Sequence, residues 1–161
     1  MVEEPKFVVD GMLGKLARWL RILGYDVKYY RSIDDDSLIE IAEKENRILL
    51  TRDNALYRKS IAKSVHSIFL EDDSRVKNLA KISKNLGIKL KVDTAVSRCP
   101  KCNSRIKPVA KNAVRGKVPE KTFRRVEEFW ICPNCGQVYW RGSHWKNIYV
   151  TLNEVKKSVS Q

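Results

Sequence analysis

The sequence predicts an α/β protein in which a mostly parallel sheet flanked by helices is followed by a small β-rich module. Three observations support this prediction. Short apolar runs alternate with helix-like segments in the first part, short aromatic and β-branched runs replace them in the second, and two Cys-x-x-Cys pairs occur only in the second. We place the two parts at residues 1–95 and 96–161.

The first part contains four strand-like runs, each followed by a helix-like segment. The runs cover residues 6–9, 27–30, 47–51 and 67–70, and the helical segments cover 12–23, 37–44, a stretch that begins near 54, and 74–86. This alternation predicts right-handed crossovers and a parallel sheet with helices on both faces. The second part has many turn residues and no long helical repeat, which favours a β-ribbon.

Charge is distributed unevenly along the chain. Residues 1–97 carry 18 Lys and Arg against 15 Asp and Glu, whereas residues 98–161 carry 14 against 4, so most of the net charge of +13 lies in the second part. A concentrated positive field attracts polyanions, and phosphate contacts add the gain from released counterions. Nucleic acid is therefore the expected partner, and a generally basic composition is the alternative explanation.

We expect neither a membrane span nor a secretory signal peptide in this sequence. No apolar run is long enough for a membrane span, and the first residues, MVEEPKFVVDG, are acidic where a signal peptide is basic. We therefore expect a cytoplasmic protein that does not enter the membrane. The sequence does not predict an oligomeric state.

The four cysteines form two pairs with metal-ligand spacing. Cys99 and Cys102 lie in CPKCN, and Cys132 and Cys135 lie in CPNCG. Two thiolates separated by two residues converge readily on one tetrahedral ion, and a chain without a secretory signal favours metal binding over disulfides. Four cysteine ligands leave no open position for water, so we expect a structural Zn²⁺.

Spacing leaves some alternatives to this site open. Redox pairs or two disulfides are one alternative, although Pro100 and Pro133 inside the pairs favour knuckle-like turns. An iron or iron–sulfur centre uses the same ligands. The 29 residues between the pairs need a hairpin or loop of their own, for which Pro108, Gly116 and Pro119 supply turn residues.

Acidic residues follow every predicted strand of the first part. Asp10 follows the first strand, Asp35 and Asp36 follow the second, and Asp53 follows the third. Because the carboxyl ends of parallel strands meet at one edge, we expect these side chains to cluster there. Such a cluster binds Mg²⁺ or Mn²⁺, which activates water for phosphodiester hydrolysis. The competing explanation is helix capping, since each acid precedes a predicted helix.

Basic residues accompany these acids. Arg18 and Arg21 are three residues apart on the first predicted helix and so share a face, Lys15 lies one turn earlier, and Arg52 precedes Asp53. We expect the four basic side chains to hold a substrate phosphate. A solvated basic face, or internal pairing with the acids, is the alternative.

Four segments together resemble the Mut7-C RNase domain family. They are DGMLGKLARWLRILGYDV, DDDSLIEIAEKENRILLTRD, RCPKCN and CPNCGQVYWRGSHW, and the similarity spans roughly residues 6–149. The resemblance implies a PIN-like nuclease domain joined to a zinc-ribbon domain. It also implies a metal-dependent ribonuclease, which we expect to be an endoribonuclease whose basic ribbon assists RNA binding.

The resemblance also implies roles for particular acids. Asp10 corresponds to the first acid of PIN domains, the Asp35 and Asp36 pair to the second, and Asp53 of the TRD motif to the third. A fourth acid would come from Glu71, Asp72 or Asp73. The implied partner is RNA, either structured or associated with the ribosome, although the residues alone do not distinguish RNA from DNA.

The ribbon residues admit a second function. Its aromatic side chains, Trp130, Tyr139, Trp140 and Trp145, are able to stack unpaired bases, although core packing is their commoner use in so small a module. For His144, a structural role competes with RNA contact or proton transfer. If all the acids are helix caps, the protein is instead a non-catalytic RNA- or ribosome-binding adaptor.

Overall fold

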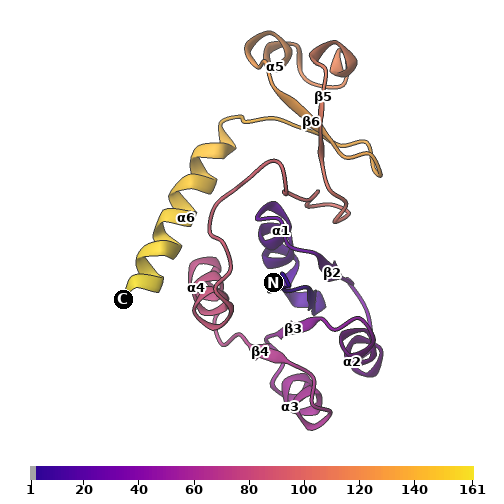
Figure 1. Ribbon diagram of the computed structural model, residues 1–161, viewed down its shortest axis with the longest axis vertical. Helices are drawn as coiled ribbons and strands as arrows, with labels where there is room; N and C mark the ends of the chain where they lie inside the picture. The colour runs from indigo at the N-terminus through magenta and orange to yellow at the C-terminus, as the bar shows by residue number, and fades with distance from the viewer. Residues whose placement is uncertain (1–2) are drawn as a thin grey trace.

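A four-stranded parallel sheet forms the centre of the N-terminal half. The computed structural model describes residues 3–161 and is shown in Figure 1. The strands are β1 (Phe7–Val9), β2 (Val27–Tyr29), β3 (Ile48–Thr51) and β4 (Ser67–Phe69), in the order β2-β1-β3-β4. Every neighbouring pair is parallel, which confirms the α/β prediction.

Helices cover both faces of this sheet. They are α1 (Gly14–Ile22), α2 (Asp35–Lys44), α3 (Asn54–Ala62) and α4 (Arg75–Leu86), with a 3₁₀ turn, η1 (Gly11–Leu13), before α1. In β1, Phe7 and Val9 pack on the side of α1 and α4, whereas Val8 packs on the side of α2 and α3. This alternation is that of a strand buried on both faces.

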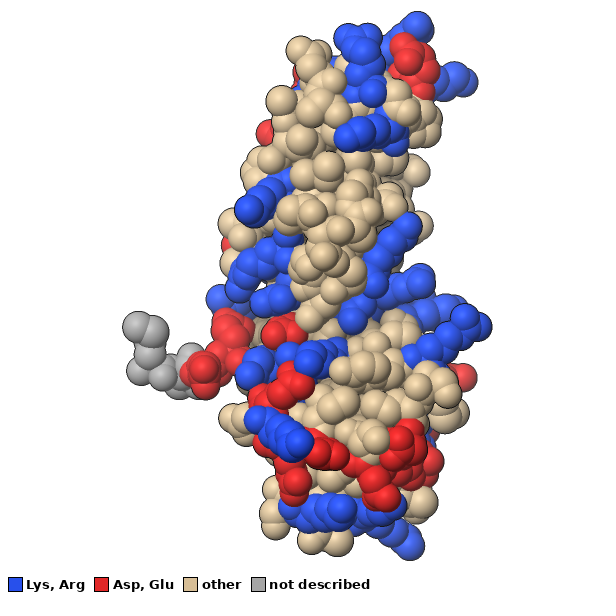
Figure 2. Space-filling model, turned by 90° about the vertical axis from the view of Figure 1, so that its right-hand side faces the viewer, with Lys and Arg blue, Asp and Glu red and all other residues tan. Residues whose placement is uncertain are grey.

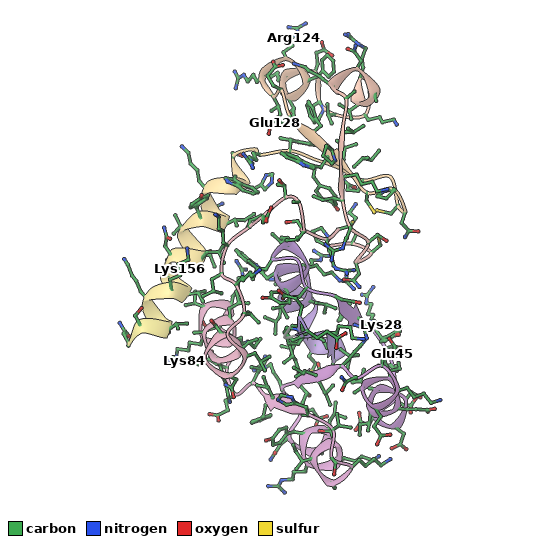
Figure 3. The ribbon with its side chains drawn as sticks, viewed as in Figure 1. Lys28, Glu45, Lys84, Arg124, Glu128 and Lys156 are labelled. Atoms are coloured by element: carbon green, nitrogen blue, oxygen red, sulfur yellow. The ribbon has the colours of Figure 1, made fainter. Side chains whose placement is uncertain are left out.

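A polar network fixes the amino ends of the strands. Arg47, directly before β3, donates from Nη1 to the Asp26 carboxylate (2.9 Å) and to the Phe7 carbonyl (3.1 Å). Its Nε donates to Glu45 at 3.0 Å, and Glu45 in turn pairs with Lys28 at 2.7 Å, as the labelled side chains in Figure 3 show. These contacts fix β1, β2 and β3 relative to one another at their amino ends, and the predicted site lies at the opposite, carboxyl ends.

The ribbon contains a second, antiparallel sheet. Its strands are β5 (Lys107–Val109), β6 (Phe129–Ile131) and β7 (Val138–Tyr139), in the order β5-β6-β7. The segment between β5 and β6 holds η2 (Lys111–Val114) and α5 (Glu120–Arg125). Gly116 (φ 81°) and Pro119 serve as turn and helix-start residues as expected, but Pro108 lies inside β5, which tolerates it as an edge strand.

The chain ends in a long helix, α6 (His144–Ser160), which runs back along the N-terminal half and packs on α4 (Figure 1). The expectation that the second part has no long helix is therefore wrong. The apolar residues Ile148, Leu152, Val155 and Val159 recur at helical spacing and pack in the main core. Among residues 3–161, no helix is long and apolar enough to cross a bilayer.

Candidate functional site

The carboxyl edge of the sheet places Asp10 at its centre. Asp10 is 7% exposed and caps η1 by accepting from the backbone N–H of Met12 at 2.8 Å. Its other oxygen accepts from the hydroxyl of Thr51 and from the backbone N–H of Arg52 (3.3 Å). Thr51 Oγ1 also accepts from the backbone N–H of Asp53 at 2.9 Å, so the TRD segment is hydrogen-bonded to the β1 acid.

Two other predicted acids lie at helix starts around this centre. Asp53 caps α3 by accepting from the backbone N–H groups of Ala55 (2.9 Å) and Leu56 (3.2 Å). Asp36 forms an ion pair with Lys59 at 2.7 Å, and this contact lowers the pKa of the Asp36 carboxyl. Asp53 therefore caps a helix, as the competing explanation expects. The oxygens of a capping carboxylate are also able to bind a cation.

The cap of α2 comes from an acid outside the predicted set. Asp34 accepts from the backbone N–H (3.0 Å) and the hydroxyl (2.7 Å) of Ser37, and these bonds hold the pKa of Asp34 below its usual value. Asp35 is half-buried in the first turn of the same helix. Within residues 3–161, the group of His, Cys, Asp or Glu side chains that could hold a metal ion is the four cysteines, and none of the four predicted acids belongs to such a group.

The acids after β4 differ from one another in their surroundings. Asp72 accepts from the backbone N–H of Ser74 at 2.8 Å and pairs with Lys77 at 3.2 Å, which lowers its pKa. Glu71 is exposed and lies 3.9 Å from Lys81. Only Asp73 lines the cleft described next, so it is the best placed of the three to act as the fourth acid.

A basic cleft of about 930 Å³ is lined by Gly11 and Arg52, although Asp10 itself is not among its lining residues. It lies between η1, the start of α4 and the first cysteine knuckle. Three of its cationic side chains, Lys15, Arg18 and Arg52, belong to the predicted substrate-binding set, and Arg75 and Lys101 add two more. Sequence reasoning missed Arg75 and Lys101, which lie far from the acids in the chain. Figure 2 shows that Asp and Glu side chains gather mostly in the lower half of the face that it presents, with basic side chains among them.

Arg21 lies in the wall of the cleft but has a different environment. It is 7% exposed, and its Nε and Nη2 donate to the Val27 carbonyl at 3.0 and 2.8 Å. Its Nη1 donates to the Pro100 carbonyl at 2.8 Å. All three nitrogens therefore have protein acceptors, and Arg21 attaches the first knuckle to α1 and β2. Burial lowers the pKa of Arg21, and the nearby Cys102 and Cys99 act in the opposite direction by raising it.

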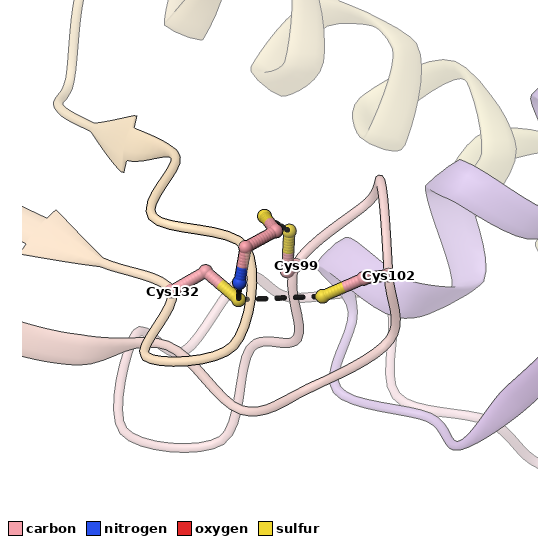
Figure 4. A group of neighbouring side chains, drawn as sticks. Cys99, Cys102 and Cys132 are labelled. Atoms are coloured by element: carbon pink, nitrogen blue, oxygen red, sulfur yellow. Dashed lines mark hydrogen bonds between the residues drawn. The ribbon is translucent and has the colours of Figure 1, made fainter.

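The four cysteines converge as predicted. The Sγ atoms of Cys99, Cys102, Cys132 and Cys135 all lie within 4.8 Å of one another, and Figure 4 shows Cys102 facing Cys132 across a gap of 3.3 Å. Cys99 and Cys135 are 3.7 Å apart. Tetrahedral zinc with bonds of about 2.3 Å separates its sulfurs by a little under 4 Å. The geometry therefore fits one ion held by four sulfurs.

The surroundings of the sulfurs also favour a bound cation. Burial raises the pKa of the Cys132 thiol to about 12, so a nearby positive ion favours the thiolate form of this residue. The Tyr139 hydroxyl lies 2.9 Å from Cys99 Sγ, and burial raises its pKa, which keeps it able to donate to the sulfur. Such outer hydrogen bonds orient metal ligands. The donor set thus fits Zn²⁺.

Comparison with known families agrees with this architecture. The description Mut7-C RNAse domain matches residues 5–152, which is nearly the whole chain. The chain belongs to this family. Membership indicates a nuclease-like, RNA-related function, with RNA as substrate or partner. No curated protein and no solved structure matches the chain.

In this member of the Mut7-C family, the first knuckle is attached directly to the sheet unit. Asn103 accepts from the Val27 N–H at 3.0 Å and donates to the Asp26 carboxylate at 2.7 Å. The Ser97 hydroxyl donates to the Ile22 carbonyl at 2.6 Å. These contacts, together with Arg21, fix Pro100 and Lys101 in the cleft wall. The polar residues Ser97 and Asn103 carried no sequence signal for this role.

Proposed function

We propose that this protein is a metal-dependent endoribonuclease with a PIN-like N-terminal domain and an RNA-binding zinc ribbon. The observation that carries the proposal is the basic cleft, which is lined by Gly11, the residue after Asp10, and by Arg52, whose backbone N–H donates to the Asp10 carboxylate. RNA presents a phosphate at every nucleotide, and the cleft offers several cationic side chains together with Tyr29 and Asn78. Membership of an RNase family supports the same activity.

The proposed roles follow from where each side chain lies. Arg18 and Lys15 are exposed on α1 and hold the phosphate on one side of the cleft, while Arg52, next to Asp10, holds it on the other. Asp10, fixed by Thr51, stays oriented during the reaction because its three donors leave it little freedom.

The donor chemistry of the edge suits a hard divalent cation. Asp10, Asp53 and the pair Asp35 and Asp36 offer only carboxylate oxygens, which Mg²⁺ and Mn²⁺ prefer. When bound there, such an ion lowers the pKa of a water molecule and so supplies the nucleophile for phosphodiester hydrolysis. We assign Zn²⁺ a structural role at the cysteines, in the wall of the cleft.

A second candidate function is a non-catalytic RNA- or ribosome-binding adaptor. It is favoured by the roles that the acids have in the structure, since Asp53 caps α3 and Asp36 pairs with Lys59. In this case the positive charge of the ribbon does the binding, and the carboxyl edge has no chemical role.

One experiment separates the two candidates. Zinc-loaded wild type, Asp10→Asn, Asp53→Asn and a control, Asp34→Asn, are incubated with labelled single-stranded and structured RNA, with and without added Mn²⁺ or Mg²⁺. Omitting the divalent ion avoids a chelator, which would also remove the zinc. Asparagine caps helices about as well as aspartate, so Asp53→Asn keeps α3 intact.

The nuclease proposal expects cleavage that needs the added ion, is retained in Asp34→Asn and is lost in the other two variants. RNA binding without cleavage by wild type would favour the adaptor. Equal cleavage by all four proteins would mean that the activity lies elsewhere or belongs to a contaminant.

A further inference from the structure

A second cavity lies on the other side of the first knuckle from the basic cleft. It has a volume of about 160 Å³ and is enclosed by the ribbon, the segment that precedes Cys99, and the start of α6. Pro100 lines both this cavity and the cleft. An RNA strand bound in the cleft therefore reaches the second cavity by passing over this knuckle.

The walls of the cavity are aromatic. Trp130, Trp140 and Trp145 line it together with Tyr139. The core of the ribbon is built from other residues, chiefly Phe123, Phe129 and Val138, against which Trp140 alone of these four packs. Trp130 is itself buried at 7% exposed and the Tyr139 hydroxyl contacts Cys99, so Trp145, which is half-buried, is the aromatic side chain most available to a ligand.

A cation is held at the same place. The guanidinium of Arg141 lies 5.5 Å from the ring centre of Trp130 and 5.3 Å from that of Trp145. Arg141 is exposed, and no carboxylate in residues 3–161 pairs with it, nor does any acidic side chain line the cavity. Stacking between two indoles uses the faces of a guanidinium and leaves its N–H edge free for an anion such as a phosphate.

The glycine after Arg141 allows the aromatic wall to form. A Cβ at Gly142 would lie 2.9 Å from Nε1 of Trp140 and 3.3 Å from the ring of His144. Only glycine permits the chain to pass this close to the indole, so the positions of Trp140 and His144 depend on it.

We propose that this cavity binds one unpaired nucleobase of the RNA, stacked against Trp145, while Arg141 holds an adjoining phosphate. The size suits a single ring, because an apolar cavity of about 150 Å³ is known to hold benzene. Base stacking on aromatic side chains is the usual means of binding single-stranded nucleic acid. The inference rests on the proposed function only in taking RNA as the ligand, and it does not require cleavage.

The test measures affinity for RNA in the full-length, zinc-loaded protein. Binding of fluorescein-labelled single-stranded RNA, and of a duplex of the same sequence, is followed by anisotropy in an Asp10→Asn background without added divalent ion. The variants are Trp145→Ala and Arg141→Gln. Their controls are Val150→Ala, an exposed apolar residue on the same helix that does not line the cavity, and Arg125→Gln, an exposed ribbon arginine.

We expect Trp145→Ala to weaken binding of the single strand about tenfold, which is about 1.4 kcal/mol, and the duplex much less. Arg141→Gln should weaken the single strand more than Arg125→Gln does. Thr94→Phe fills the cavity and leaves its aromatic residues unchanged, so it should weaken binding of the single strand as Trp145→Ala does. Thermal melting checks that each variant is folded.

Other outcomes overturn the proposal. Equal losses in the pocket variants and their controls would mean that the ribbon binds by charge alone. Equal losses for single strand and duplex would exclude an inserted base. Cleavage assays of wild type and of Trp145→Ala separate the two proposals. If wild type cleaves RNA and Trp145→Ala binds RNA as tightly as wild type, only the base-binding cavity is refuted. If Trp145→Ala binds RNA more weakly but wild type does not cleave, only the nuclease is refuted.

Discussion

Arg18 and Arg21 are three residues apart on α1, and the structure predicts opposite consequences for their loss. Replacing Arg21 by Met removes three hydrogen bonds, two to the Val27 carbonyl and one to the Pro100 carbonyl. Hydrogen bonds from charged donors contribute about 1.5–3 kcal/mol each. Taking the lower value for each of the two carbonyls gives a loss of about 3 kcal/mol.

The assay is thermal and urea unfolding, with Arg18→Met as the matched control. A loss of about 3 kcal/mol corresponds to a fall in Tm of about 6–12 °C for a chain of this length. Arg18 is exposed, so its replacement should change the free energy of unfolding by less than about 0.5 kcal/mol. Similar unfolding free energies for the two variants would refute the assignment of Arg21 to a structural role.

In RNA binding, we expect Arg18→Met to have an effect and Arg21→Met to have none, which is the reverse of their effects on stability. If Arg18 contacts a phosphate, Arg18→Met reduces the slope of log affinity against log salt by about 0.7 for single-stranded RNA. Arg21→Met, measured well below its Tm, should leave that slope unchanged because Arg21 already has protein acceptors for all three nitrogens.

Three further changes test other parts of the structure. Removal of Zn²⁺ by a chelator should unfold the knuckles and weaken RNA binding, because Pro100 and Lys101 line the cleft; metal release and anisotropy measure the two effects together. Gly11→Ala should cost about 1–3 kcal/mol in urea unfolding, since the added Cβ would lie 2.6 Å from the Arg31 carbonyl oxygen. Burial alone raises the pKa of Asp26, but hydrogen bonds from Arg47 and Asn103 outweigh it and hold the pKa below its usual value. That stabilisation is complete above the unfolded pKa of about 4 and is lost as the pH falls through the folded value, so Asp26→Asn should flatten the dependence of stability on pH below about 4.

The sheet and the metal centre were predictable because their signals are local. Alternation of apolar runs with helical segments placed all four strands, and the two Cys-x-x-Cys pairs indicated the cluster of four cysteines before any geometry was known. Asp10 could be placed at the end of a buried strand for the same reason. Each strand, and each of the two cysteine pairs, depends on residues within a few positions of one another.

The remaining features depend on contacts between distant segments. Arg21 has the same local pattern as Arg18, but its guanidinium donates to the Val27 carbonyl in β2 and to the Pro100 carbonyl, 79 residues further along the chain. Asp53 was expected either to bind a cation or to cap a helix, and in the structure it caps α3, whereas the ion pair between Asp36 and Lys59 had no sequence signal. Cation binding by these acids stays a prediction. The final helix was missed because its β-branched residues favour strands, although its apolar spacing of three and four residues is helical.

The packing of α6 on α4 has a consequence for how the protein is made. Leu152 and Val155 of α6 belong to the same apolar core as Phe7 and Leu20, so α6 completes a core whose other residues are synthesised earlier. Until α6 leaves the ribosome, the face of α4 that packs against it has no cover. Folding of the N-terminal half during translation should therefore stop at an intermediate with exposed apolar surface, which chaperones are able to bind.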